Sequence, residues 1–279
     1  MKIPDNITLP FFAYGLFKPG QLCFYRIKEL VKNVSSAEIE GILKERDGIP
    51  LLVLSEGTKI KGALIQFKEG FEEEAYKRII EIEPDEVYQW KENVRALGNI
   101  CANVLLGRRP DKGSTDLEHV DNWDGRKDPY FLDAIEEIEV ILRDNSKFDW
   151  DFKKLFRLQM AYSLLWICLE RYAGLRYHFG EEVSKKLRYI ADEDGFIGAL
   201  KKYVKRTGEV HSATDPRKRS KLDPDDSRKS IDYYYQVRCN SIHRGKAVVK
   251  DFDILRESAE ELLNIFKDML SIAWDTSVL

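Results

Sequence analysis

The sequence predicts an α+β protein in which a small mixed β-barrel is followed by an all-α helical bundle. Residues 1 to about 110 hold short apolar runs that alternate with polar residues and are separated by turn signals, which is typical of strands. From Lys147 onward, apolar residues recur at helical spacing instead. A chain of 279 residues is long enough for two domains of ordinary size. We therefore expect one domain over residues 1–145 and a second over residues 146–279.

The first elements are predicted from short patterns. Leu9–Tyr14 is an apolar run that predicts a strand, and the spacing of apolar residues predicts a helix over Gln21–Lys32. Two later segments, Ile39–Leu43 and Ile60–Leu64, share the form I-x-G-x-[IA]-L. A glycine inside a strand marks a bulge or a close backbone approach. Two such glycines at matched positions predict a strongly curved sheet or a small barrel.

The rest of the first domain mixes helices and strands. The pattern predicts a helix over Phe71–Ile80 and two strands over Val87–Ala96 and Ile100–Leu106. Residues 107–129 are rich in Gly, Asp, Pro and Arg, which predicts an irregular loop. A helical stripe follows over Tyr130–Leu142.

The second domain is predicted to be helical throughout. A long, wide apolar face from Lys147 to Tyr172 indicates a central helix. The other predicted helices are Glu181–Ala191, Phe196–Lys205, Asp225–Arg244 and Phe252–Ala273. The polar stretch Gly208–Pro224 is expected to be an exposed, mobile loop. Together these helices predict a four- or five-helix up-and-down bundle.

Composition narrows the class of protein. Hydrophobic residues make up 43% of the chain and charged residues 33%, and no apolar run reaches the ~20 residues that span a bilayer. We therefore expect no membrane association. The N-terminus lacks a signal-peptide pattern and the four cysteines form no CxxC pair, so we expect a reducing, cytoplasmic location. The four histidines show no metal-ligand spacing, and we expect neither a metal nor a cofactor.

One stretch of the first domain resembles a known family. Phe12–Gly20 reads F-A-Y-G-L-F-K-P-G, and it resembles the opening loop of the gamma-glutamylcyclotransferase-like (AIG2-like) family, F-x-Y-G-[ST]-L followed by a basic residue and glycine. The two I-x-G segments resemble that family's paired strands, and Gly48–Val53 resembles the stretch between them. Ile79–Pro84 stands where the family carries L-D-x-x-E-G. Glu83 matches the catalytic glutamate of that motif.

The resemblance implies a barrel with a pocket for a gamma-glutamyl substrate or another small molecule. Backbone N–H groups after Tyr14 would bind the substrate carboxylate. Glu83 would be the general acid/base that lets the α-amine attack the γ-carbonyl and release 5-oxoproline, which needs a carboxyl whose pKa approaches neutrality. The implied substrate-binding residues are Tyr14, Gly15, Leu16, Phe17 and Tyr88.

The sequence departs from that family at three positions. Leu16 replaces a Ser or Thr, Ile80 replaces an Asp, and Pro84 replaces a Gly. Leu16 cannot donate a side-chain hydrogen bond to a substrate. The alternative for Glu83 is a solvated carboxylate at a helix end, which is the common environment of glutamate.

The penultimate predicted helix carries a second resemblance. Its end, Arg238-Cys-Asn-Ser-Ile-His243, resembles the R-x(4–6)-H motif of HEPN-domain proteins. This implies a metal-independent endoribonuclease that cuts single-stranded RNA, with Arg238, Asn240 and His243 at the site. The Arg fork suits phosphate, and His can move a proton at a ribose 2′-OH, which DNA lacks. Five positions along a helix span about 140° around its axis. We therefore expect a homodimer that brings two motifs together.

The local charge agrees with a polyanion partner. Residues 201–250 hold 14 Lys and Arg against 6 Asp and Glu, a net charge of +8 in a chain whose total is −3. The residues expected to contact RNA are Arg244, Lys246, Arg217, Lys218, Arg219 and Lys221. The alternative for Arg238 and His243 is a helix-end pair beside the negative end of the helix dipole.

Three functions stay open. The first is a ribonuclease in which the cyclotransferase-like domain senses a ligand or regulates cleavage, which by family analogy suits a toxin or an antiviral defence protein. The second is a gamma-glutamyl cyclotransferase with a dimerising helical tail. The third is a non-enzymatic protein that binds a ligand and assembles with a partner. The local positive charge favours the first function, and Leu16 and Ile80 count against the second.

Overall fold

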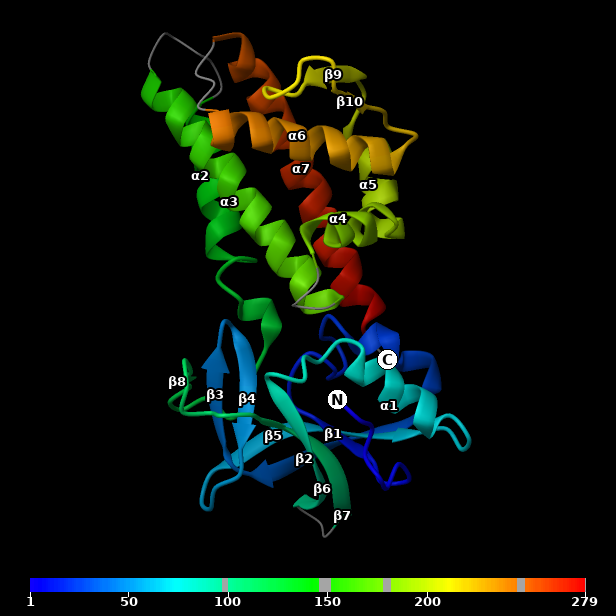
Figure 1. The fold of residues 1–279 in the computed structure, drawn as a ribbon. Helices are drawn as coiled ribbons and strands as arrows, with labels where there is room; N and C mark the ends of the chain where they lie inside the picture. Colours follow the sequence, from blue (N-terminus) through cyan, green and yellow to red (C-terminus); the bar gives the residue numbers. More distant parts are fainter. Residues whose placement is uncertain (97–99, 146–151, 178–181, 245–248, 279) are drawn as a thin grey trace. The chain divides into compact units, whose positions relative to one another are not determined.

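The structure is a computed structural model that describes residues 1–96, 100–145, 152–177, 182–244 and 249–278, with residues 242–244 and 249–250 described by their backbone alone (Figure 1). The described chain forms two compact units. The first, called the sheet unit, is Met1–Asp128 with the segments that begin at Leu175 and Trp274. The second, called the helical unit, lies within residues 129–273. The chain is therefore mixed α+β, as its sequence predicts.

The main sheet of the sheet unit has five strands. In order across the sheet they are β2 (Val31–Glu40), β5 (Lys59–Phe67), β1 (Phe11–Ala13), β7 (Ile100–Gly107) and β6 (Tyr88–Ala96). Among the described strands, only β1 and β7 pair in parallel, with Phe11 opposite Asn103. The short central strand β1 is buried along its whole length and has a hydrogen-bonded neighbour on both edges. The residue after β1 is Tyr14, which belongs to the candidate site.

The prediction of a closed barrel is wrong for the described residues, whose strands in this unit form two sheets. The second sheet has the order β4 (Ile49–Val53), β3 (Ile42–Arg46) and β8 (Thr115–Asp116). Gly41 separates β2 from β3, so the chain leaves the first sheet there and enters the second (Figure 1).

The close approach predicted at the two strand glycines is confirmed. A Cβ at Gly41 would lie 2.7 Å from the carbonyl oxygen of Val53. A Cβ at Gly62 would lie 2.5 Å from the ring of Phe12 and 2.6 Å from the carbonyl oxygen of Ala13. Each glycine therefore allows a contact between segments that a side chain would prevent.

The helix predicted over Gln21–Lys32 is wrong. The structure has two 3-10 turns there, η1 (Phe24–Arg26) and η2 (Lys28–Leu30), and β2 begins at once. The buried residues Phe24, Ile27 and Leu30 are spaced by three, which matches the 3.0 residues per turn of a 3-10 helix. The spacing that predicts an α-helix therefore fits this tighter form as well.

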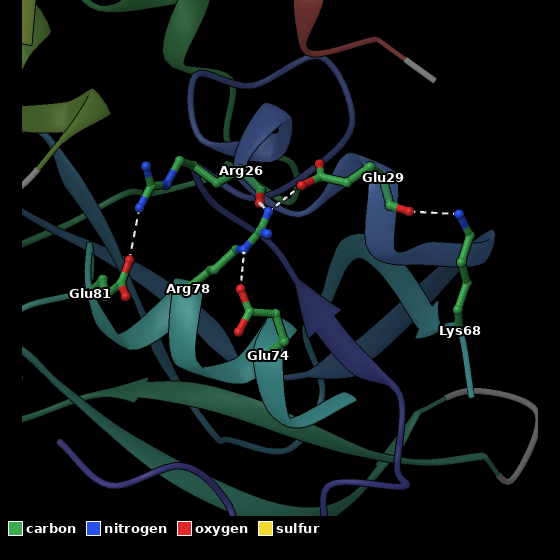
Figure 2. Close-up of polar contacts among 6 residues, drawn as sticks. All are labelled: Arg26, Glu29, Lys68, Glu74, Arg78 and Glu81. Atoms are coloured by element: carbon green, nitrogen blue, oxygen red, sulfur yellow. Dashed lines mark hydrogen bonds and ion pairs between the residues drawn. The ribbon is translucent and has the colours of Figure 1, made fainter. Parts of the chain in front are cut away.

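Helix α1 (Glu72–Ile80) is confirmed and is tied to the 3-10 turns by a polar cluster, shown in Figure 2. Arg78 donates to Glu74 at 2.8 Å, to the carbonyl oxygen of Arg26 at 2.8 Å, and to Glu29. Arg26 in turn pairs with Glu81 at 2.8 Å, just beyond the end of α1. The cluster therefore holds the C-terminal end of α1, which leads into Glu83.

The helical unit is built from six α-helices in its described part. They are α2 (Asp133–Asp144), α3 (Phe152–Arg176), α4 (Val183–Ala191), α5 (Asp194–Tyr203), α6 (Ser227–Arg244) and α7 (Val249–Thr276), of which α3 and α7 end in residues of the sheet unit. The last five, α3 to α7, correspond to the five helices predicted after Lys147, and α2 corresponds to the helical stripe predicted over Tyr130–Leu142. The largest fully buried side chains of the helical unit include Trp166, Tyr172, Phe196, Phe252 and Phe266. No described helix is long and apolar enough to cross a membrane.

The mobile loop predicted over Gly208–Pro224 is wrong, because the chain there forms a β-hairpin. Strands β9 (Gly208–His211) and β10 (Arg219–Leu222) pair in antiparallel register. Leu222 is 1% exposed, so a buried apolar side chain anchors the hairpin. The polar, basic composition of this stretch does not predict such an anchor.

Candidate functional site

Glu83 lies in a turn directly after α1. Its backbone N–H donates to the carbonyl oxygen of Ile79 at 3.0 Å. The carbonyl oxygen of Pro84 then accepts from the N–H groups of Val87 and Tyr88, both at 3.0 Å. Two successive turns therefore fix Glu83 between α1 and the start of β6.

The carboxyl of Glu83 is buried and has no polar partner. Only 7% of the residue surface is exposed, and no hydrogen bond or ion pair joins its carboxylate to another described residue. Burial raises the pKa of Glu83 from 4.5 to about 8, since an unpaired charge is costly away from water. The alternative of a solvated helix-end carboxylate is therefore wrong. Buried groups with strongly shifted pKa values are concentrated at functional sites.

Glu83 lines a cavity of about 20 Å³, which holds about one water molecule. The residues around the cavity come from β1, the loop after it, the turn after α1, and strands β6 and β7. They are Phe11, Ala13, Tyr14, Gly15, Leu16, Phe17, Glu83, Tyr88 and Leu105. The structure thus brings Glu83 together with all five residues expected to bind substrate.

Two tyrosine hydroxyls connect the walls of this cavity. Tyr14 donates to the carbonyl oxygen of Leu105 at 2.8 Å and accepts from the N–H of Leu52 at 3.2 Å. Tyr88 donates to the carbonyl oxygen of Pro50 at 2.7 Å. Burial raises the pKa of both tyrosines, and the nearby carboxyl of Glu83 adds to this. Both hydroxyls therefore stay protonated and hold β4 against β6 and β7.

The loop after β1 presents unused hydrogen-bond donors. Its carbonyl groups are occupied: Gly15 accepts from the N–H of Lys18 at 3.1 Å, and Leu16 accepts from the N–H of Cys23 at 3.0 Å. The N–H groups of Gly15, Leu16 and Phe17 donate to no other residue in the described part of the chain. Successive backbone N–H groups in a turn form an anion-binding concavity. The cavity is therefore lined by a protonatable carboxyl and by three residues whose backbone N–H groups have no partner in the described chain.

Arg238 and Asn240, in the R-x4-H motif of α6, have different partners. The guanidinium of Arg238 lies 3.3 Å from the carboxylate of Glu170 and 5.5 Å from the ring centre of Tyr235. Its Nε atom is buried and has no hydrogen-bond partner. His243 belongs to the backbone of α6, but its side chain and that of Arg244 lie outside the described residues, as does Lys246 altogether.

Asn240 attaches the hairpin to α6. Its side chain accepts from the N–H of Ala213 at 2.9 Å and donates to the carbonyl oxygen of His211 at 2.8 Å. It also accepts from Gln236 at 2.9 Å. With 8% of its surface exposed, this amide is occupied in holding the fold together.

The hairpin carries the other four expected RNA contacts on its surface. Arg219 and Lys221 alternate with the inward Leu222 along β10, and Arg217 and Lys218 precede them. Arg217 pairs with Asp215 at 2.9 Å and Arg219 with Glu209 at 3.1 Å. Lys218 and Lys221 are exposed and form no ion pair within the described residues.

The predicted set omits three lining residues, Phe11, Ala13 and Leu105. All three lie in apolar runs without a polar signal, so only the pairing of β1 with β7 places them here. Among the described residues, no group of three His, Cys, Asp or Glu side chains is arranged to hold a metal ion. The chain matches no protein-family model, no curated protein and no solved structure.

Proposed function

We propose that the Glu83 cavity is an active site for acid/base chemistry on a small gamma-glutamyl substrate. The observation that carries this proposal is the buried, unpartnered carboxyl of Glu83 beside three unused backbone N–H donors. A general acid/base works best when its pKa lies near the operating pH, and a pKa of about 8 meets that condition. The donors in the loop after Tyr14 would bind the substrate carboxylate.

The proposed reaction is an internal aminolysis. The α-amine of the substrate attacks its own γ-carbonyl carbon and forms a new C–N bond, while the C–N bond to the leaving amine breaks. Glu83 takes the proton released by the attacking amine and returns it to the leaving amine, so the carboxyl is regenerated. The products are 5-oxoproline and a free amine.

The size of the cavity sets a condition on this proposal. A volume of about 20 Å³ is too small for a gamma-glutamyl group, so lining side chains must move when the substrate binds. Leu16 and Phe17 are the groups expected to move, because they lie in a loop and not in a strand.

The test is release of 5-oxoproline from a panel of gamma-glutamyl dipeptides. We expect turnover by the wild type and by Glu81→Gln, an exposed carboxylate two residues away. Glu83→Gln is expected to lose about 100-fold or more in turnover, the usual contribution of a general acid/base. Full activity of Glu83→Gln would contradict the proposal. Turnover by none of the three proteins would favour the non-enzymatic, ligand-binding alternative.

A metal-independent ribonuclease in the helical unit is the second candidate, and the position of the hairpin favours it. Asn240, inside the R-x4-H motif, fixes a hairpin with four exposed cations beside α6. Positive side chains that neutralise phosphates supply most of the affinity for nucleic acid. In this proposal the hairpin holds single-stranded RNA and Arg238 and His243 act at the phosphate, in a homodimer that brings two motifs together.

This second candidate is tested with a mixed RNA pool in EDTA. We expect the wild type to cut the RNA and leave 2′,3′-cyclic phosphate ends, and we expect His243→Ala and Arg238→Ala to be inactive. The double variant Lys218→Ala/Lys221→Ala is expected to cut with a higher KM and an unchanged kcat. Equal cleavage by wild type and His243→Ala would rule out this role for the motif.

A further inference from the structure

A second, larger hollow lies in the sheet unit and shares no lining residue with the Glu83 cavity. It is an open groove of about 930 Å³, a volume in the range of small-molecule sites. The loop after β1 contributes Tyr14–Phe17 to the Glu83 cavity and Lys18–Gln21 to this groove. The groove is completed by parts of β2 and β5 and by residues 122, 124 and 126.

Lys18 is a buried cation at this groove that lacks a counter-charge. Only 9% of its surface is exposed, and its ammonium group donates to the side chain of Asn122 at 2.6 Å and to the carbonyl oxygen of Trp123. No carboxylate lies within 4.0 Å of it among the described residues. Burial lowers the pKa of Lys18, and the more distant Asp124 opposes this shift. Buried charges in proteins are normally paired, so the absent counter-charge is an unusual feature.

The acids of the groove do not supply that counter-charge. Asp124 accepts from the side chain of Gln21 at 2.9 Å and from the N–H of Arg126 at 3.0 Å, which occupies its Oδ1 atom. Glu38 is half-buried and forms no ion pair with a described residue. Lys61 differs from Lys18, because it pairs with Asp121 at 2.6 Å.

Arg126 adds a second cation to the same groove. Its guanidinium donates to the carbonyl oxygen of Gly20 at 3.2 Å and lies 5.7 Å from the ring centre of Trp274. It forms no ion pair with a carboxylate in the described part of the chain. The groove therefore combines two cations that form no ion pair with a described carboxylate, although Asp124 acts on both over a longer distance, and one of the two is fixed by burial.

We propose that this groove binds a small carboxylate ligand, with its carboxylate beside Lys18 and Arg126. A carboxylate supplies the counter-charge that Lys18 lacks and can accept hydrogen bonds from both cations. A phosphate is less suitable, because it concentrates two negative charges on one group beside Asp124, whereas a carboxylate group places a single charge there. The site is independent of the function proposed for Glu83.

Calorimetric titration of the full-length protein with succinate tests this site, with the neutral diamide succinamide as the matched ligand. We expect succinate to bind with a Kd below about 10 mM and succinamide not to bind. Lys18→Gln and Arg126→Gln are each expected to weaken succinate binding about 10-fold or more, the loss of a charge-assisted contact. Lys127→Gln, next to Arg126 but outside the groove lining, is expected to bind like the wild type.

Two controls make the outcome decisive. Glu83→Gln is expected to bind succinate like the wild type, so loss of binding there would move the ligand to the other cavity and overturn the proposal. If Lys18→Gln does not fold, Arg126→Gln decides alone. Failure of succinate to bind the wild type, equal binding of succinate and succinamide, or wild-type affinity in Arg126→Gln would each overturn the proposal.

Discussion

The hydroxyl of Tyr14 lies 3.2 Å from the backbone nitrogen of Leu52, which donates to it. The same hydroxyl donates to the carbonyl oxygen of Leu105 at 2.8 Å. Leu52 belongs to β4 in the small sheet and Leu105 to β7 in the large sheet. One buried side chain therefore connects the two sheets directly beside the Glu83 cavity.

Replacing Tyr14 by Phe should destabilise the protein more than replacing Tyr88. Tyr14→Phe leaves the buried N–H of Leu52 and the carbonyl oxygen of Leu105 without that hydroxyl, at a cost of about 2 kcal/mol. Tyr88→Phe removes one bond, to Pro50, and should cost about 1 kcal/mol. Urea denaturation of both variants measures the difference. The reverse order of stability would contradict the bridging role of Tyr14.

Glu83 should make the stability of the protein depend on pH. Below pH 4.5 the carboxyl is protonated in both the folded and the unfolded state, so its burial carries no charge penalty. Between pH 4.5 and about 8 the unfolded chain releases the proton and the folded chain keeps it, so the free energy of unfolding falls. The total loss is on the order of 5 kcal/mol, since one pKa unit is about 1.4 kcal/mol.

The variant Glu83→Gln isolates the contribution of this carboxyl to the pH dependence of the free energy of unfolding. The free energy of unfolding of the variant minus that of the wild type should rise between pH 4.5 and 8 and then level off. Urea denaturation at several pH values measures it, and Glu81→Gln is the control because that carboxylate is exposed. Parallel pH curves for Glu83→Gln and the wild type would show that the carboxyl is not buried as described.

Alanine at Gly62 should be strongly destabilising. Its Cβ would lie 2.5 Å from the ring of Phe12 and 2.6 Å from a backbone oxygen, so β1 and β5 would have to separate. We expect a loss of about 2 kcal/mol or more. Gly198→Ala, in α5 with no atom within 4 Å of the new Cβ, should instead stabilise by about 0.5–1 kcal/mol. Thermal denaturation of both variants compares them, and similar melting temperatures would refute the close approach.

Asn240→Ala should release the hairpin from α6. The substitution leaves the N–H of Ala213 and the carbonyl oxygen of His211 without their partner, at a cost of about 1–3 kcal/mol. Trypsin should then cut faster at Arg217 or Lys218, because the hairpin opens more often. Ser241→Ala is the control, since that hydroxyl donates only to Val237 within α6. Unchanged trypsin cleavage in Asn240→Ala would argue against this anchoring.

Much of the architecture follows from local patterns in the sequence. Apolar spacing predicts α1, α3 and α7, and alternation predicts β5, because each pattern records which face of an element is buried. The glycines at positions 41 and 62 predict close backbone approaches by their position inside the predicted strands, and Gly41 proves to lie between β2 and β3. For the candidate site, the resemblance of the segment around Glu83 to a family motif predicts a functional carboxyl with Tyr14 and Tyr88 nearby. All three residues line the same cavity.

Local sequence patterns are therefore enough to predict the α+β class, most of the helices and strands, and Glu83 as a candidate acid/base. The three-dimensional fold is needed to see that the strands form two sheets, that Gly208–Pro224 holds a hairpin, and that Glu83 and Lys18 are buried. The physical reason is that periodicity reports the environment of apolar residues along one element. The burial of a polar group depends instead on segments distant in sequence, as Trp123 lies over a hundred positions from Lys18.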